Sequence, residues 1–261
     1  MSSGISTRLV QLVHPGEGRR AALVHQNTLH LLATYRSLYA FAQAAVETGW
    51  KLRDLLSTDL SGIVLDYDEV YRFETLWRFC PCFDHPQEPG RCVVSAAGPP
   101  WRYIASCASL RGHGDPLPAA GSPDVAAVYL IAPDGSPRRI GVAQGHRGRV
   151  SALGPELVLD PELPRLHGVA ATGSRSQELS AEVPLLLALA SIEPDHFEAA
   201  DFRRPGDVHV HFFGERLLTP FSPLEAGNED QAQIEFEGLG PPLRNPIRHQ
   251  APAARTAAVP L

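Results

Sequence analysis

The sequence predicts a β-rich α+β fold, and three of its features indicate this class. Prolines make up 24 of the 261 residues, well above the usual share of about 5%, and they favour short strands and fixed turns over long helices. Short strand-like runs recur between turns rich in glycine and proline. Hydrophobic residues are 44% and charged residues 20% of the chain, as in an ordinary globular protein rather than a disordered one.

The first third of the chain predicts a small α+β unit. Strand-like runs joined by the turns PGEG and Gln26-Asn27 cover residues 8–14, 19–25 and 28–33. A helix is expected next, because one helical face gathers Leu38, Phe41, Ala42 and Ala45, and Gly49 ends it. A second short helix is expected at residues 51–56. The breaker-rich stretch FCPCFDHPQEPG, residues 79–90, marks the boundary, so residues 1–90 form the predicted N-terminal domain.

The remainder is predicted to be a second, β-rich domain over residues 91–250. A hairpin is expected at residues 124–145, around the turn Pro133-Asp134-Gly135-Ser136. A helix is expected at residues 181–193, with Pro184 in its first turn. Further strands are expected at residues 155–160, 166–173, 206–214 and 232–240, and residues 251–261 read as a disordered tail.

Composition excludes several classes of function. A net charge of −6, without clusters of lysine, arginine and aromatic residues, does not fit a nucleic-acid or membrane-surface protein. The longest apolar run, residues 183–192, is too short to cross a bilayer, and the first residues lack the pattern of a signal peptide. We therefore expect a cytoplasmic protein. Its four cysteines are expected to be buried reduced thiols rather than metal ligands, since Cys80 and Cys82 have only one residue between them.

Two stretches of the C-terminal half carry a family resemblance. FRRPGDVHVHFFG, residues 202–214, followed by QAQIEFEGLGPPLRNPI, resembles the closing segment of the fumarylacetoacetate hydrolase superfamily, in its branch related to bacterial 2-keto-3-deoxy sugar-acid dehydratases. RLVQLVHPGEGRRAALV and DHPQEPGRCVVSAAG resemble the same branch. The resemblance implies a mixed β-roll behind a small N-terminal domain, usually as a homodimer. It also implies a small-molecule substrate, a 2-oxo acid or 1,3-diketone, activated by Mg²⁺ for C–C or C–O cleavage.

The sequence departs from the family at its metal ligands. The family's Glu-x-Glu pair corresponds here to Ser122 and Asp124, and the later aspartate is missing from GHRGRVSALGPEL, residues 145–157. Two lysines of related sequences correspond to Ile104 and Ser176. Because Mg²⁺ needs several oxygen ligands in near-octahedral geometry, Asp124 alone cannot hold it. We therefore expect no metal and no other cofactor, with a conventional Mg²⁺ site as the alternative.

The pair His209 and His211 allows three interpretations. Residues two apart on a strand share a face, so His209, His211 and Phe213 point one way, and Val208, Val210 and Phe212 the other. The histidines can be hydrogen-bonded scaffold residues or substrate contacts at the rim of a pocket. They can also be ligands of a transition metal, with a third ligand among His113, Asp115 and His146.

The candidate catalytic residues are therefore Asp124, His209, His211 and Tyr103. The candidate substrate-binding residues are His146, Arg147, Phe213 and Arg203. Each has a plainer structural interpretation: Asp124 begins a strand, His146 and Arg147 lie in a basic turn, Arg203 anchors a turn or a dimer contact, and Tyr103 packs in a core or an interface.

Three hypotheses of function follow. The first is a metal-independent lyase, isomerase or cyclase that acts on a polyfunctional carbonyl compound, such as a biosynthetic intermediate, through an enolate stabilised by the histidines or Arg147. The second is a conventional Mg²⁺-dependent 2-oxo acid dehydratase or C–C hydrolase. The third is a catalytically inactive binding or assembly partner.

Overall fold

The computed structural model describes residues 6–97, 102–161, 163–218, 226–228 and 230–249. The predicted tail at residues 251–261 lies outside them. The N-terminal third begins with three antiparallel strands, β1 (Thr7–His14), β2 (Gly18–His25) and β3 (Thr28–Leu32). It continues with the helices and strands α1 (Leu38–Thr48), α2 (Leu52–Ser57), β4 (Leu60–Asp66), α3 (Tyr67–Tyr71) and β5 (Arg78–Phe79).

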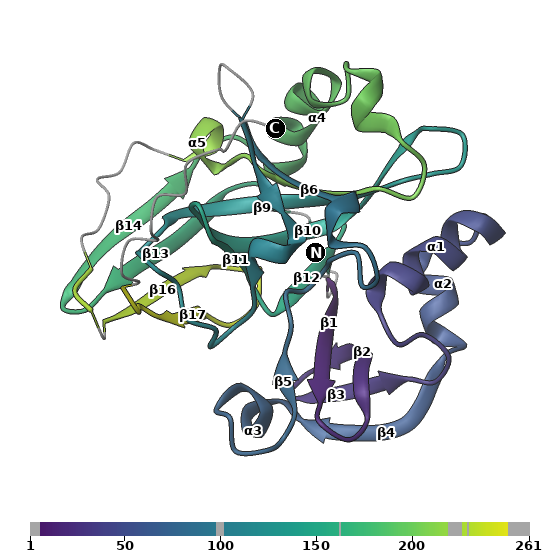
Figure 1. Ribbon diagram of the computed structural model, residues 1–261, viewed down its shortest axis with the longest axis horizontal. Helices are drawn as coiled ribbons and strands as arrows, with labels where there is room; N and C mark the ends of the chain where they lie inside the picture. Colours follow the sequence, from purple (N-terminus) through teal and green to yellow (C-terminus); the bar gives the residue numbers. More distant parts are fainter. Residues whose placement is uncertain (1–5, 98–101, 162, 219–225, 229, 250–261) are drawn as a thin grey trace, which may run out of the picture.

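The remaining elements confirm the β-rich expectation (Figure 1). The strands are β6 (Cys92–Ala96), β7 (Arg102–Ser106), β8 (Leu110–Arg111), β9 (Ser122–Ile131), β10 (Pro137–Arg147), β11 (Ser151–Leu153), β12 (Glu156–Leu159), β13 (Leu166–Thr172), β14 (Arg175–Ala181), β15 (Val208–Phe212), β16 (Gln231–Phe236) and β17 (Leu243–Pro246). The helical segments are α4 (Leu185–His196), α5 (Gly214–Leu217) and the 3₁₀ turns at Pro89–Arg91, Cys107–Ser109 and Ala200–Arg203. Among the described residues, no helix has the length and apolar composition needed to cross a membrane.

Two sheets build the fold. The large sheet has the strand order β4-β3-β2-β1-β12-β10-β9-β15-β6-β7, and a four-stranded sheet has the order β14-β13-β16-β17. The large sheet is mixed, because β15 runs parallel to β6 and antiparallel to β9. β1 pairs with β12, so the N-terminal strands extend the large sheet across the predicted domain boundary.

Local chemistry explains the best-predicted elements. Ser37 caps α1, since its Oγ accepts a hydrogen bond from the Ala40 N–H at 3.1 Å, and Gly49 ends the helix at a φ of 72°. The β9–β10 hairpin turns at residues 133–136 as expected, with Gly135 at a φ of 77° and the Gly135 N–H bound to the Ala132 carbonyl at 2.9 Å.

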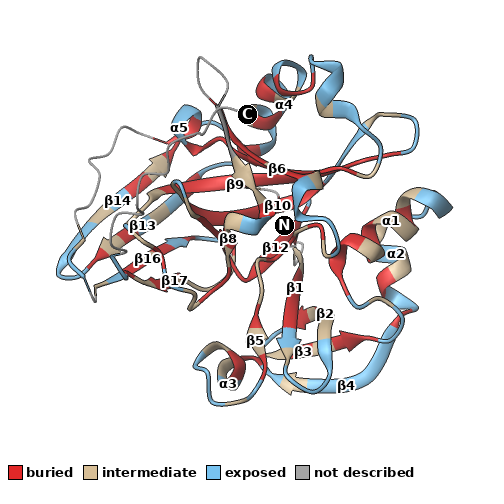
Figure 2. Cartoon of the chain, viewed as in Figure 1, coloured by how far each residue is buried: buried red, intermediate tan, exposed pale blue. Residues whose placement is uncertain are grey.

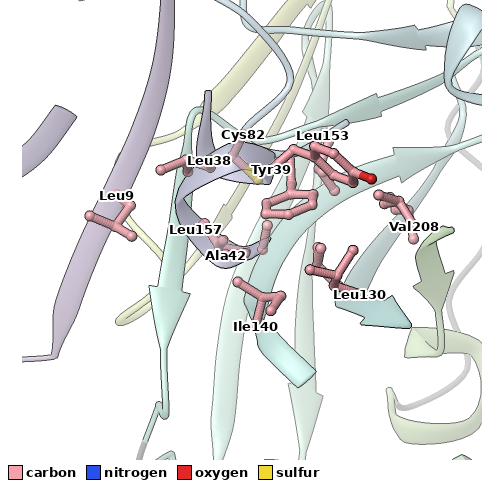
Figure 3. Packing of buried hydrophobic residues seen from close by; sticks show 14 of the residues in the cluster. Leu9, Leu38, Tyr39, Ala42, Cys82, Leu130, Ile140, Leu153, Leu157 and Val208 are labelled. Atoms are coloured by element: carbon pink, nitrogen blue, oxygen red, sulfur yellow. The ribbon is translucent and has the colours of Figure 1, made fainter. Parts of the chain in front are cut away.

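The central strands β9 and β15 of the large sheet are buried on both faces, whereas the edge strand β4 is largely exposed, as Figure 2 shows. Alternate residues of β9 and β15, among them Val128 and Val210, pack with the α1 side chains in one core, part of which is drawn in Figure 3. The other residues, among them Tyr129 and Phe213, pack against α4 and the four-stranded sheet in a second core. A one-residue alternation thus decides which layer each site residue faces.

The cysteines differ from the expectation. Cys92 of β6 and Cys107 form a disulfide, with their Cα atoms 5.3 Å apart, whereas Cys80 and Cys82 are free thiols. The interpretation of all four as reduced thiols is therefore wrong for one pair. Cys92 and Cys107 are 15 residues apart in the sequence, and the antiparallel pairing of β6 with β7, which sets Val93 opposite Ser106, brings them together. Burial raises the pKa of the Cys80 thiol to about 11.

Candidate functional site

Asp124 and Arg147 meet at one end of the large sheet. Asp124 lies near the start of β9 and Arg147 ends β10, and the hairpin register places Gly145 opposite Asp124. Both side chains therefore extend from the same face of the sheet. The Asp124 Oδ2 accepts a hydrogen bond from the Arg147 Nε at 2.6 Å. Its Oδ1 accepts from the N–H groups of Val125 at 2.8 Å and Gly214 at 2.5 Å.

A second carboxylate completes this arrangement. Glu215, in α5, places its Oε2 3.0 Å from the Arg147 Nη2, so the guanidinium lies between two carboxylates. Asp124 is fully buried, whereas the side chain of Arg147 is 18% exposed and that of Glu215 is 60% exposed. The cation is therefore held from inside by Asp124 and can be reached from solvent beside Glu215.

Burial dominates the electrostatics of Asp124. Desolvation raises the pKa of its carboxyl group to about 6, although the charge and hydrogen bond of Arg147 act in the opposite direction. Near neutral pH the group is therefore mostly ionised and paired with the guanidinium. Because Asp124 has no exposed surface, it acts on a bound molecule only by positioning Arg147.

The residues present do not fit a family-type magnesium site. Of the two positions that correspond to the Glu-x-Glu pair, Ser122 has no carboxylate and Asp124 has committed both oxygens to three N–H donors. A divalent cation at Asp124 would also lie beside the positive charge of Arg147. Within the described ranges, no group of three or more His, Cys, Asp or Glu side chains is arranged to hold a metal ion.

His209 and His211 lie on the face predicted for them, opposite the buried valines of β15. Both are buried beneath α4, where they meet His196. The His196 Nε2 and the His209 Nδ1 are 3.2 Å apart, and the rings of His196 and His211 stack with their centroids 4.0 Å apart. The Ser95 Oγ lies 2.9 Å from the His211 Nδ1. This position fits the scaffold interpretation more closely than the rim of an open pocket.

The three imidazoles are neutral groups in this setting. Burial lowers the pKa of His196 to about 2, of His209 to about 4 and of His211 to about 3. A neutral imidazole cannot offer a full positive charge to an enolate, so the cluster is a weaker candidate for that role than Arg147.

The residues proposed as a third metal ligand do not join the pair. His146 is adjacent to Arg147 in β10, so it points to the opposite face of the sheet. It is buried there, and neither ring nitrogen has a hydrogen-bond partner among the described residues. Burial lowers the pKa of His146 to about 3. His113 and Asp115 lie beside β17, where the Arg244 N–H donates to the His113 Nδ1 at 3.3 Å. His146 and Arg147, both candidate substrate-binding residues, therefore lie on opposite faces of the sheet.

The other candidates occupy different places. Phe213 follows β15 at the same end of the sheet as Asp124 and is buried in the second core. The backbone of Tyr103 pairs with Ser95 through β7, also near this end, and its side chain is outside the described part of the structure. Arg203 is exposed at the opposite end, where with Tyr129 and Phe197 it borders a surface pocket of about 510 Å³.

Comparison with solved structures identifies the fold. No family model matches the sequence, and no curated protein matches it. The 2-hydroxyhepta-2,4-diene-1,7-dioate isomerase from Mycobacterium marinum superposes with a TM-score of 0.61 at 15% identity, over 93% of this chain and 98% of that one. The chain has the fumarylacetoacetate hydrolase fold.

Two further structures with this fold cover the chain equally well. A 2-keto-3-deoxyarabinonate dehydratase superposes with a TM-score of 0.61 at 13% identity, over 94% of this chain and 100% of that one. The fumarylacetoacetate hydrolase from psychrophilic Exiguobacterium antarcticum gives 0.60 at 10% identity, over 94% of this chain and 100% of that one. The expected mixed β-roll with an N-terminal α+β unit is thereby confirmed at the level of the fold.

Sequence reasoning missed two residues of these clusters. His196 lies beyond Pro194, where the expected helix ended, but α4 continues through this proline. Glu215 belongs to a four-residue helix that has no periodic signal. The signal that could have identified Glu215 is its position, since it is a carboxylate directly after the expected strand at residues 206–214.

Proposed function

We propose that the protein is a metal-independent enzyme on the fumarylacetoacetate hydrolase fold, acting on a 2-oxo acid or a related polyfunctional carbonyl compound. The observation that supports this is the guanidinium of Arg147, held by Asp124 at 2.6 Å and by Glu215 at 3.0 Å. A fixed cation thus stands beside the carboxylate that corresponds to a metal ligand in the family. The reaction class is a lyase, isomerase or cyclase reaction through an enolate.

The chemistry assigned to these residues is a proton transfer. Arg147 binds the substrate through its exposed edge and stabilises the negative oxygen of the enolate, as preorganised N–H donors do in oxyanion sites. Glu215 takes the proton from the carbon next to the carbonyl group. The electron pair of that C–H bond forms the C=C bond of the enolate, and the π pair of the carbonyl group moves onto its oxygen. Asp124 holds the guanidinium in place.

Hydrogen–deuterium exchange at carbon tests this proposal without knowledge of the complete reaction. The protein is incubated in D₂O with a panel of 2-oxo acids and 1,3-dicarbonyl compounds, and loss of the α-proton signal is followed by NMR. We expect catalysed exchange that persists in excess EDTA. Arg147→Met should reduce it by about a hundredfold, the usual cost of removing an oxyanion donor, whereas Arg149→Met, a change at an exposed neighbour, should not.

Three outcomes separate the alternatives. Exchange that EDTA abolishes and Mg²⁺ restores favours a conventional Mg²⁺-dependent dehydratase or hydrolase. Exchange unchanged in Arg147→Met contradicts the assigned role of the guanidinium. Absence of exchange with every compound, together with no binding of oxalate as a mimic of a planar enolate, favours an inactive assembly partner.

A further inference from the structure

A second site lies between α3 and the edge of the four-stranded sheet, on the side of the molecule where Figure 1 shows α3 below β16 and β17. Here a pocket of about 310 Å³ is lined by Tyr71, Arg72, Phe73, His113, Gly114, Gln231, Arg244 and Pro246. None of these residues belongs to the Asp124–Arg147 site.

The pocket has a rigid aromatic wall. The rings of Tyr71 and His113 stack with centroids 4.2 Å apart and planes 24° apart, and Phe73 stacks on His113 at 5.4 Å and 12°. The Tyr71 hydroxyl donates to the Pro242 carbonyl at 2.5 Å. The His113 Nδ1 accepts from the Arg244 N–H, and its Nε2 lies 3.2 Å from the Tyr71 carbonyl, so the hydrogen-bond pattern assigns the ring proton to Nε2. The wall is thus fixed before any ligand arrives.

Phe73 occupies a backbone position that suits glycine. It follows the last residues of α3 at a φ of 64°, in the left-handed region that bulky side chains rarely adopt. Its ring stacks on His113 and lies near the Arg78 guanidinium, whose Cζ is 5.5 Å from the ring centroid. The residue is still 42% exposed, so burial alone does not explain a phenylalanine here. Strained residues of this kind gather at binding sites, where the side chain is needed in one orientation. Its ring lies against Gly114, where no side chain would fit.

Arg244 supplies an available charge. Its Cζ lies 5.7 Å from the Tyr71 ring centroid, and its Nε donates to the Gln233 Oε1 at 2.9 Å. Among the described residues, no carboxylate forms an ion pair with it, whereas Arg72, on the same pocket, is paired with Glu74 at 3.0 Å. A half-buried guanidinium beside aromatic rings is suited to a carboxylate.

We propose that this pocket binds a planar aromatic carboxylate, with its ring packed against the exposed part of Phe73 and its carboxylate on Arg244. A contact between aromatic rings and a charged N–H···O pair then act on one molecule, and a volume of about 310 Å³ accommodates a single-ring ligand. The pocket is separate from the site of the proposed function, so either can exist without the other.

The probe for this site is 4-fluorobenzoate, followed by ¹⁹F NMR with the full chain, beside the neutral 4-fluorobenzamide. We expect saturable binding of the acid in the millimolar range or tighter and at least tenfold weaker binding of the amide. Arg244→Gln should weaken binding of the acid at least tenfold. Arg72→Gln removes a charge of the same pocket that is already paired, so it should leave binding of the acid unchanged.

Phe73→Gly separates a binding role from a structural one. This substitution removes the ring, so we expect weaker binding of 4-fluorobenzoate. It also removes the backbone strain at the positive φ, so we expect Tm to be unchanged or raised. Equal binding of acid and amide, full binding by Arg244→Gln, or no saturable binding overturns the proposal. So does a large loss of Tm in Phe73→Gly with 4-fluorobenzoate binding retained in Phe73→Leu, because Phe73 would then be a packing residue.

Discussion

At the scale of single residues, six buried histidines of the described chain make stability depend on pH. Burial lowers the pKa of each of them below its usual value of about 6.5: His85, His113, His146, His196, His209 and His211. When the pH falls below about 6.5, the unfolded chain takes up protons that the folded chain does not, so folding loses about 1.4 kcal/mol per pH unit for each histidine.

Two carboxyl groups act in the opposite direction. Burial raises the pKa of Asp124 to about 6 and that of Glu156 as well, so the folded chain binds protons there that the unfolded chain does not. The effect of the six histidines exceeds that of the two carboxyl groups, so the net result is a loss of stability between about pH 6.5 and 4.5. Urea denaturation at several pH values should show this fall, and His196→Leu should flatten it relative to a change at the exposed His167. A midpoint independent of pH would contradict the burial of these rings.

Arg147 also shows how far residue-level prediction reached. The hairpin turn at residues 133–136 has a local chemical signature, but the turn alone does not set the register at the site. The pairing shifts by one residue between Arg139 and Gly141, and this irregularity places Gly145, rather than Gln144, opposite Asp124. The period of two predicts the common face of His209, His211 and Phe213. It also separates His146 from Arg147, although the sequence predicts one basic turn for the two, because the expected hairpin ends at Gly145.

At the scale of elements, the Cys92–Cys107 disulfide links the start of β6 to the residue that follows β7, over a separation of 15 residues. A loop of this size, when cross-linked, stabilises a fold by about 3 kcal/mol through the unfolded state. Reduction, or Cys92→Ser, should therefore lower the free energy of unfolding by roughly that amount, whereas Cys80→Ser at a free thiol should have no redox-dependent effect. Four titratable thiols in the denatured, unreduced protein would show that the bond does not form.

Long-range contacts explain what the sequence could not predict at this scale. No local sequence pattern indicates that Cys92 contacts Cys107. The contact between His196 and His209 likewise depends on how α4 packs against the sheet. Pro194 indicated a helix end, but tertiary packing of Leu189 and Ile192 in the second core carries α4 one turn further. Such packing overrides local signals whenever a buried face continues past a breaker.

At the scale of the whole molecule, the fold is an extended sheet whose central strands are covered on both faces, with the N-terminal strands joined to the β-roll through β1 and β12. The division at residue 90 and the homodimer remain predictions. The architecture was predictable because residues 202–214 and 231–247 resemble the fumarylacetoacetate hydrolase superfamily, and solved structures at only 10–15% identity share the fold. The site was less predictable, because the resemblance assigns no role to Arg147 or Glu215.

Binding of Mn²⁺ to the purified protein is the measurement that tests the central claim most directly. A guanidinium at 2.6 Å from Asp124 occupies the place where a cation would bind that carboxylate, so titration calorimetry with Mn²⁺ should detect no site tighter than about millimolar. Stoichiometric Mn²⁺ binding at micromolar concentration, lost in Asp124→Asn and kept in Arg147→Met, would contradict the account.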